Sequence, residues 1–341
     1  MSLDEVKEQP QAIDALTRAL KAGQVHHAWL FQGPDGVGKE LTALGLAQAM
    51  TCPVKPNVGC GTCASCQKIA KRNHPDVTWV MPEEEFVSRG LAARSDFAGT
   101  PSRDIRIEQI RKLQERLAFR ALEAPYKLAL IVTAHAMNPP AQNALLKTLE
   151  EPPKDTILVL ISSATDKLLP TIRSRCAKAS FGPLSPQFIA QHLMAKKKVE
   201  PALAEQIAAM SAGSLSRALE LNPKALAHRK ELIEQFEALV PGDARGWLAL
   251  AETMGADRQT AEDALEILQT WNHDVALAQV GGTGLVNVDL QALAVSAGAK
   301  VSHANLHRRT VLIDEARNAI TQRNGAARLQ LERMLVEMFA S

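Results

Sequence analysis

Hydrophobic and polar positions follow two different rhythms along this chain, and the rhythm changes near Gly182. Before that point, short apolar runs of strand length alternate with stretches in which apolar residues recur every three or four positions, the spacing of an amphipathic helix. The runs of strand length are residues 28–32, 77–80, 127–134, 156–161 and 177–181. Strands that alternate with helices predict a parallel sheet covered on both faces.

Helices are expected between these strands at residues 39–50, 107–117 and 140–149. The second of them carries apolar residues at helical spacing from Ile107 to Leu117. By contrast, residues 82–104 combine charged residues with scattered glycine and proline and have little periodicity, which predicts a polar excursion or mobile loop.

After Gly182 the apolar pattern is helical, and no further strand signal is convincing. Residues 184–224 predict about three short helices. Residues 225–341 predict a larger bundle, with candidate helices near 225–239, 243–256, 258–279, 287–296, 302–322 and 324–339. We therefore expect three domains: an α/β domain over 1–182, a small helical domain over 183–224 and an all-α domain over 225–341.

Composition agrees with this division and narrows the function. A chain of 341 residues suits two or three domains, and a hydrophobic fraction of 46% is ample for their cores. The net charge of +2 argues against a surface that grips DNA everywhere, although it allows a local basic patch. No stretch is long and apolar enough to span a membrane, and no signal peptide is visible, so a cytoplasmic protein is expected.

A Gly-rich segment at residues 33–40 reads Gly-Pro-Asp-Gly-Val-Gly-Lys-Glu and fits the phosphate-binding pattern G-x-x-x-x-G-K-[ST] except at its last position. Such a loop holds phosphates with backbone N–H groups at a helix N-terminus. The candidate nucleotide-binding residues are Gly33, Gly36, Gly38 and Lys39. Glu40 replaces the hydroxyl that holds Mg²⁺. A carboxylate there can reach a metal, but it also places negative charge beside the phosphates, so binding of ATP or ADP should be weak or absent.

Hydrolysis would also need an apolar strand that ends in Asp, often followed by Glu, because Asp holds Mg²⁺ and Glu polarises the attacking water. The strand that fits this position is residues 127–134, where the two acidic positions hold Val132 and Thr133. No other apolar strand before Gly182 ends in an Asp-Glu pair. The sequence therefore predicts the scaffold of an ATPase without its catalysis.

Four of the five cysteines cluster with the spacing C-x7-C-x2-C-x2-C. They are Cys52, Cys60, Cys63 and Cys66. In a reducing compartment such a cluster indicates a metal site, and four thiolates suit tetrahedral Zn²⁺ in a structural role, with no open position for a substrate. An iron–sulfur cluster is the alternative, but its run continues to a further Cys-Pro, which residues 67–70 do not supply. The fifth, Cys176, is expected to be a small buried apolar residue.

Several segments, in their order along the chain, resemble the clamp-loader branch of the AAA+ proteins. Residues 142–153 read QNALLKTLEEPP and residues 174–176 read Ser-Arg-Cys. The flanking matches are HAWLF at 27–31, the four-cysteine module after the helix that follows the Gly-rich loop, IRIEQIR at 105–111 and GSLSRAL at 213–219. The resemblance covers the whole chain.

Within this branch, two kinds of bacterial subunit carry the four-cysteine module. The gamma/tau motor keeps the complete ATP motifs, whereas a stator has degraded ATP motifs and keeps Ser-Arg-Cys. This sequence is similar to the stator. The resemblance implies a RecA-like AAA+ domain, a small helical lid and a helical collar through which five subunits, gamma/tau and delta among them, form a ring. That ring opens the sliding clamp and loads it on primed DNA for DNA polymerase III.

The resemblance also implies roles for two arginines. Arg175, in Ser-Arg-Cys, would act in trans as an arginine finger at the ATP site of the adjoining motor subunit. Arg217 lies where the family has the sensor arginine of its lid domain. By residue type alone, each could instead be a surface arginine that pairs with a neighbouring acid.

Two other functions stay open at this point. The chain could be an ATP-hydrolysing motor of the gamma/tau kind, with Glu40 as its metal ligand, or a zinc-dependent module that binds nucleic acid. The missing acids at Val132 and Thr133 weigh against the motor. The near-neutral charge and the lack of interleaved aromatic and basic residues weigh against the nucleic-acid module.

Overall fold

The computed structural model describes residues 3–321 and 325–339, which belong to two compact units, Met1–Ser185 and Pro186–Ser341. The first unit is built on a sheet of five parallel strands in the order β2-β3-β4-β1-β5. The strands are β1 (Ala28–Gln32), β2 (Val77–Val80), β3 (Lys127–Ile131), β4 (Thr156–Ser162) and β5 (Ala177–Ser180). The predicted parallel sheet is thus confirmed. Strands β3 and β4 are buried along their whole length, as expected of the middle of such a sheet.

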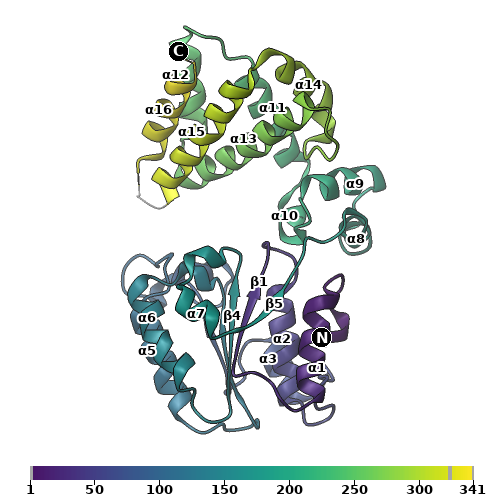
Figure 1. Ribbon diagram of the computed structural model, residues 1–341, viewed down its shortest axis with the longest axis vertical. Helices are drawn as coiled ribbons and strands as arrows, with labels where there is room; N and C mark the ends of the chain where they lie inside the picture. The colour runs from purple at the N-terminus through teal and green to yellow at the C-terminus, as the bar shows by residue number, and fades with distance from the viewer. Residues whose placement is uncertain (1–2, 322–324, 340–341) are drawn as a thin grey trace. The chain divides into compact units, whose positions relative to one another are not determined.

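Helices cover both faces of this sheet (Figure 1). On one face lie α1 (Pro10–Lys21), α2 (Lys39–Thr51) and α3 (Ala64–Ala70), and on the other α5 (Ile107–Ala118), α6 (Pro139–Glu150) and α7 (Pro170–Ser174). The helical spacing read from the sequence buries one side of α5: Ile110, Leu113 and Leu117 pack in one core with Leu145 and Leu149 of α6.

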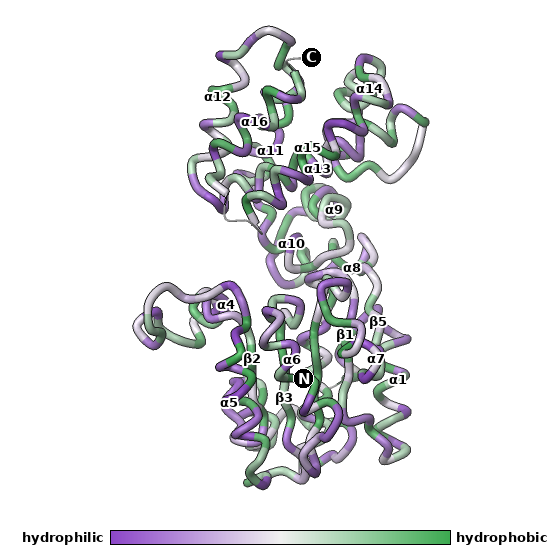
Figure 2. Tube along the Cα trace, turned by 60° about the vertical axis from the view of Figure 1, so that its left-hand side comes forward, coloured by the Kyte–Doolittle hydropathy of each residue, from purple (hydrophilic) through white to green (hydrophobic). Residues whose placement is uncertain are grey.

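The predicted polar excursion at residues 82–104 is more ordered than its composition indicates. It contains α4 (Glu83–Ser88) and a short 3-10 turn (Arg94–Asp96), and Figure 2 shows α4 and the chain after it standing away from the end of β2. Three glutamates fill the first turn of α4, where negative charge favours a helix N-terminus. Strand β3 is also shorter than predicted, because it ends at Ile131 and Thr133 adopts a left-handed conformation (φ 53°).

The second unit is helical, as predicted, and its described residues contain no strand. Its helices are α8 (Pro186–His192, continued by a π turn over Leu193–Lys197), α9 (Pro201–Met210), α10 (Leu215–Glu220), α11 (Pro223–Glu237), α12 (Ala244–Met254), α13 (Arg258–Gln279), α14 (Gln291–Lys300), α15 (His303–Thr321) and α16 (Ala327–Phe339). The predicted helix ends at residues 322 and 324 lie outside the described residues. The separation of a lid from a collar within this unit stays a prediction.

Polar caps and one large apolar core explain why these helices form. Asn222, Asp243 and Asp257 each accept a backbone N–H bond at the start of α11, α12 and α13. Trp271, near the middle of α13, is fully buried in the core of the bundle, and its indole N–H donates to a carboxylate oxygen of Glu237 at 2.8 Å. No helix within the described ranges is long and apolar enough to cross a membrane.

The loop between α5 and β3, residues 119–126, is held by a buried carboxylate at the start of β2. Asp76 accepts three backbone N–H bonds, from Leu122 at 2.7 Å, Glu123 at 2.7 Å and Ala124 at 2.8 Å. Burial alone would raise the pKa of Asp76, but the three N–H groups favour the charged form, and the net effect lowers its pKa. The carboxylate therefore stabilises the folded chain while it is ionised.

Asp76→Asn is expected to lower the free energy of unfolding by about 2 kcal/mol near neutral pH, because the amide has a single acceptor oxygen and directs N–H groups at the loop. Since the folded-state pKa is lowered, the contribution of Asp76 is present above the unfolded value of about 4 and is lost as the pH falls through the folded value. Urea unfolding should thus show the parent and the variant converging in stability in acid. A difference in the free energy of unfolding that stays constant with pH would contradict this. It would show that the charge of Asp76 does not stabilise the loop.

Candidate functional site

The Gly-rich loop joins the carboxyl end of β1 to the start of α2, and its three glycines all have positive φ. The values are 144° at Gly33, 72° at Gly36 and 100° at Gly38. A Cβ atom on Gly33 would lie 2.2 Å from the carbonyl oxygen of Phe181, so only glycine fits there. The predicted loop residues therefore lie together in a tight turn at a helix N-terminus, in a conformation that favours glycine.

Lys39 is satisfied by its own loop. It begins α2 and is 6% exposed. Its ammonium group donates to the carbonyl oxygen of Gly33 at 2.6 Å and to that of Pro34, and it lies 3.6 Å from a carboxylate oxygen of Asp35. Burial lowers the pKa of Lys39, and the negative charge of Asp35 opposes that shift.

Glu40, at the position of the missing hydroxyl, is bound by two arginines. One carboxylate oxygen pairs with the guanidinium of Arg72, just after α3, and the other lies 2.6 Å from Nη1 of Arg89, just after α4. Arg89 also pairs with Glu85, whose other carboxylate oxygen accepts a bond of 2.8 Å from the hydroxyl of Thr133. We call these five residues the Arg89 network.

The Arg89 network joins the two positions at which an ATPase of this kind holds its metal and its water. Glu40 occupies the hydroxyl position of the Gly-rich loop, and Thr133 occupies the acidic position after β3. Because both carboxylate oxygens of Glu40 are paired with guanidinium groups, Glu40 is not free to coordinate Mg²⁺. Partly buried arginines thus supply the positive charge at this site.

Sequence reasoning missed the arginines of this network and Glu85. Arg72 and Arg89 lie 32 and 49 residues from Glu40, and Glu85 lies 48 residues from Thr133. No local spacing carries that information, because the pairs form only once the chain has folded.

The four clustered cysteines come together in a geometry that suits a metal ion. Their Sγ atoms all lie within 4.8 Å of one another, with Cys52 and Cys63 3.8 Å apart and Cys60 and Cys66 3.9 Å apart. A tetrahedron with metal–sulfur bonds of about 2.3 Å has edges of about 3.8 Å. The structure therefore brings together all four predicted ligands.

Backbone N–H groups orient the sulfur atoms of this cluster. Sγ of Cys52 accepts from the N–H of Lys55 at 3.2 Å, and Sγ of Cys60 accepts from that of Cys63 at 3.2 Å. A hydrogen bond from the Thr62 hydroxyl is the main cause that lowers the pKa of Cys60 to about 5. These donors favour the thiolates of Cys52 and Cys60, the form in which cysteine binds a metal, whereas burial raises the pKa of Cys66 to about 12.

The cysteine cluster also fixes two helices of the first unit. Cys52 directly follows α2, and Cys66 lies within α3. The side-chain amide of Gln48, in α2, donates to the carbonyl oxygen of Cys66 at 2.8 Å. A metal here would therefore tie the helix that follows the Gly-rich loop to α3. As predicted, Cys176 is buried, and burial raises its pKa to about 12.

Arg175 caps α7 just before β5, and its side chain is 37% exposed. Its guanidinium lies 2.7 Å from a carboxylate oxygen of Glu150, at the end of α6, and donates to the carbonyl oxygen of Thr171 at 3.0 Å. The exposed carboxylate of Glu150 thus orients the guanidinium of Arg175 at the surface. A ligand with more negative charge could take the place of Glu150.

Arg217 belongs to α10, in the second unit. Its guanidinium lies 2.7 Å from a carboxylate oxygen of Glu266, on α13. Here the arginine pairs with a neighbouring acid, as its residue type alone allows, and its sensor role stays a prediction.

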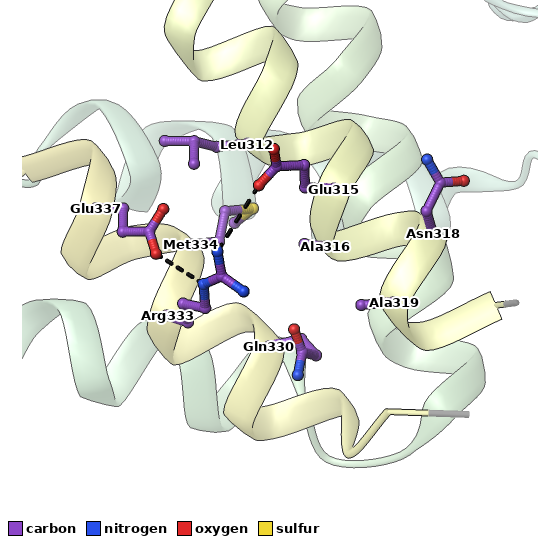
Figure 3. Close-up of a pocket in the computed structure, with 9 residues that line it drawn as sticks. All are labelled: Leu312, Glu315, Ala316, Asn318, Ala319, Gln330, Arg333, Met334 and Glu337. Atoms are coloured by element: carbon purple, nitrogen blue, oxygen red, sulfur yellow. Dashed lines mark hydrogen bonds and ion pairs between the residues drawn. The ribbon is translucent and has the colours of Figure 1, made fainter. Parts of the chain in front are cut away.

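A cavity of about 310 Å³ lies between α15 and α16, and it is a weaker candidate for a ligand site. Figure 3 shows that the carboxylates of Glu315 and Glu337 both face Arg333, at 3.9 Å and 2.7 Å. Its charged groups therefore satisfy one another.

Comparison with known proteins gives matches over both units. The family described as "DNA polymerase III, delta subunit" matches residues 8–185, and "DNA polymerase III, delta subunit, C terminal" matches residues 223–338. DNA polymerase III subunit delta' of Bacillus subtilis is 32% identical over 82% of this chain and 81% of that protein. The subunit delta' of Pseudomonas aeruginosa is 35% identical over 63% of this chain and 61% of that protein.

A solved structure supports the fold. A DNA polymerase III gamma subunit-related protein of Thermotoga maritima superposes with a TM-score of 0.50 at 17% identity, covering 96% of this chain and 98% of that one. At this level of identity the likeness concerns the fold alone.

Proposed function

This chain belongs to the family of DNA polymerase III delta-prime subunits, and from that premise we propose that it is a stator of the clamp loader that does not hydrolyse ATP. It would join gamma/tau and delta subunits in a hetero-pentameric ring in the cytoplasm and help to load the sliding clamp on primed DNA. Residues 1–182 would form the AAA+ domain, 183–224 the lid and 225–341 the collar through which the ring assembles.

The Arg89 network is the main support for a subunit that does not hydrolyse ATP. A motor needs a hydroxyl and an acid to hold Mg²⁺, and a second acid to orient water. In this chain, Glu40 is neutralised by two arginines, and Thr133 donates its hydroxyl to Glu85. The motor alternative requires Glu40 as a metal ligand, and its existing ion pairs argue against that.

We propose that the cysteine cluster holds one structural Zn²⁺. Close contact of four sulfur atoms favours a single ion, because an iron–sulfur cluster placed between the thiolates would hold them farther apart. Bound there, zinc would supply folding free energy to the α2–α3 region. With four thiolate ligands it would leave no position for a substrate.

We further propose that Arg175 reaches the ATP site of the adjoining motor subunit. Its exposure and its capping place before an edge strand allow a group from another chain to approach it. Arg217 would hold the sensor position of the lid domain, where it pairs with Glu266.

The isolated chain is expected to hydrolyse ATP no faster than background and to bind ATP or ADP weakly or not at all. Steady-state phosphate release and titration with a fluorescent ATP analogue would measure both. Lys39→Ala should leave clamp loading by a reconstituted complex nearly intact, because Lys39 serves its own loop. Turnover that Lys39→Ala abolishes would instead identify this chain as a motor.

A further inference from the structure

Two large apolar side chains project from the α5–β3 loop. Leu122 is 80% exposed and Phe119 is 73% exposed, the two highest values among the exposed large apolar residues of the described ranges. The loop that carries them is well anchored: Asp76 binds three of its N–H groups, and the buried ammonium of Lys127 donates to the carbonyl oxygens of Leu117 and Phe119. An ordered loop that holds apolar side chains in water is typical of an interaction surface.

A cavity of about 330 Å³ lies beside these side chains. We call it the loop pocket and define it by Thr78, Arg116, Leu117, Phe119, Arg120 and Leu122. It lies at the amino ends of β2 and β3, where Asp76 and Lys127 also line it. The Gly-rich loop follows the carboxyl end of β1. Because all the strands are parallel, the loop pocket and the Gly-rich loop lie at opposite ends of the sheet.

Two exposed arginines, Arg116 and Arg120, line the loop pocket. Lys112 lies four residues before Arg116 on α5, and Arg120 follows just beyond the end of that helix. All three are exposed, and within the described part of the chain none has an ion-pair partner. Like charges at this spacing repel one another, and an acidic ligand would relieve that repulsion. The nearby Glu123 is already paired with Lys68, at 2.6 Å.

We propose that the loop pocket docks an acidic peptide segment of a protein partner that carries a large apolar side chain. The apolar side chain would enter between Phe119 and Leu122, and carboxylates on either side of it would pair with Arg116 and Arg120. This arrangement follows the general pattern of short acidic motifs that are read by arginine clusters.

Nucleic acid fits this surface less well. A single strand is bound along an extended basic groove with stacked aromatic side chains. The loop pocket is compact, and Phe119 is the one aromatic residue in its lining.

The test uses the full chain and a fluorescein-labelled Asp-rich peptide that ends in Leu-Phe. Fluorescence anisotropy should show saturable, micromolar binding that weakens with added salt. The double variant Arg116→Glu/Arg120→Glu should weaken binding roughly tenfold or more, as should Phe119→Ser/Leu122→Ser. All four side chains are exposed, so circular dichroism should show that both variants fold.

Matched controls change similar side chains elsewhere. Lys196→Glu/Lys197→Glu reverses two exposed cations, and Val280→Ser removes an apolar side chain that is 71% exposed. Both should leave the affinity unchanged. The proposal is overturned if the peptide does not bind, if the controls weaken binding as much as the pocket variants, or if oligo-dT competes for the same site with higher affinity. A dimer of the chain that Phe119→Ser/Leu122→Ser dissolves would assign the surface to a second copy and overturn it as well.

Discussion

Cys63→Ser should release the metal and lower the free energy of unfolding of the first unit by roughly 4 kcal/mol or more. The binding free energy of a structural metal is folding free energy, and three remaining thiolates cannot close the tetrahedron. Loss should spread from the cluster to α3, because Cys66 and Ile69 pack there in the core and Gln48 of α2 bonds to the Cys66 backbone. Elemental analysis of the purified chain should give one zinc per parent molecule and none for the variant.

Cys176→Ser is the control for this substitution. It makes the same replacement at a buried cysteine, but Cys176 lies outside the cluster, so zinc content should stay at one equivalent. Thermal unfolding of both variants, with and without a chelator, separates loss of the metal from loss of a buried thiol. Iron in place of zinc, or no metal in the parent, would refute the assignment.

Arg175→Ala should lower the DNA- and clamp-stimulated ATPase of a reconstituted clamp loader in part and impair clamp loading more than ring assembly. A finger guanidinium stabilises charge on the transferring phosphoryl group and is worth roughly 10³–10⁵ in rate at the site it serves. Only the site that faces this subunit would suffer, so total turnover falls partially. Arg175→Lys should rescue little, because a point charge cannot reproduce the planar fork.

Glu150→Gln distinguishes a finger from an ordinary ion pair. It removes the partner of Arg175 but keeps the guanidinium, and an exposed pair contributes at most about 1 kcal/mol to stability. Turnover should therefore stay near that of the parent complex, as it should for Lys178→Ala on the neighbouring strand. Equal losses in Arg175→Ala and Glu150→Gln would assign Arg175 a structural role, and unchanged turnover in Arg175→Ala would remove the trans-acting role altogether.

Strong periodicity explains which parts of the fold could be predicted. The central strands and α5, α6 and α13 follow their patterns closely because burial on a fixed face decides each residue. Helix α1 was not predicted, although Ala12, Leu16 and Leu20 recur at helical spacing and are buried. Helices α3 and α4 are too short to show a period. The segment of α4 also makes two long-range contacts, the ion pair of Arg89 with Glu40 and the hydrogen bond from Thr133 to Glu85.

The candidate site divides in the same way. Spacing alone revealed the Gly-rich loop and the four cysteines, because backbone geometry and metal coordination both demand residues at fixed short intervals. The Arg89 network could not be read, since its arginines come from two segments that approach Glu40 only in the folded chain. The sequence showed that the acidic position after β3 holds Thr133 and no acid. It did not show that the hydroxyl of Thr133 donates a hydrogen bond to Glu85.

The Arg89 network would make the proposed loss of hydrolysis hard to reverse by single substitutions. Glu40→Thr alone would restore the hydroxyl, but it would leave the charges of Arg72 and Arg89 without the carboxylate that now neutralises them. An acid at Thr133 alone would face Glu85, a like charge. Each single reversion therefore carries a cost before any gain in turnover, and a return to a working motor would need several substitutions at once. Selection that acts on one substitution at a time would therefore not restore ATP hydrolysis at such a site.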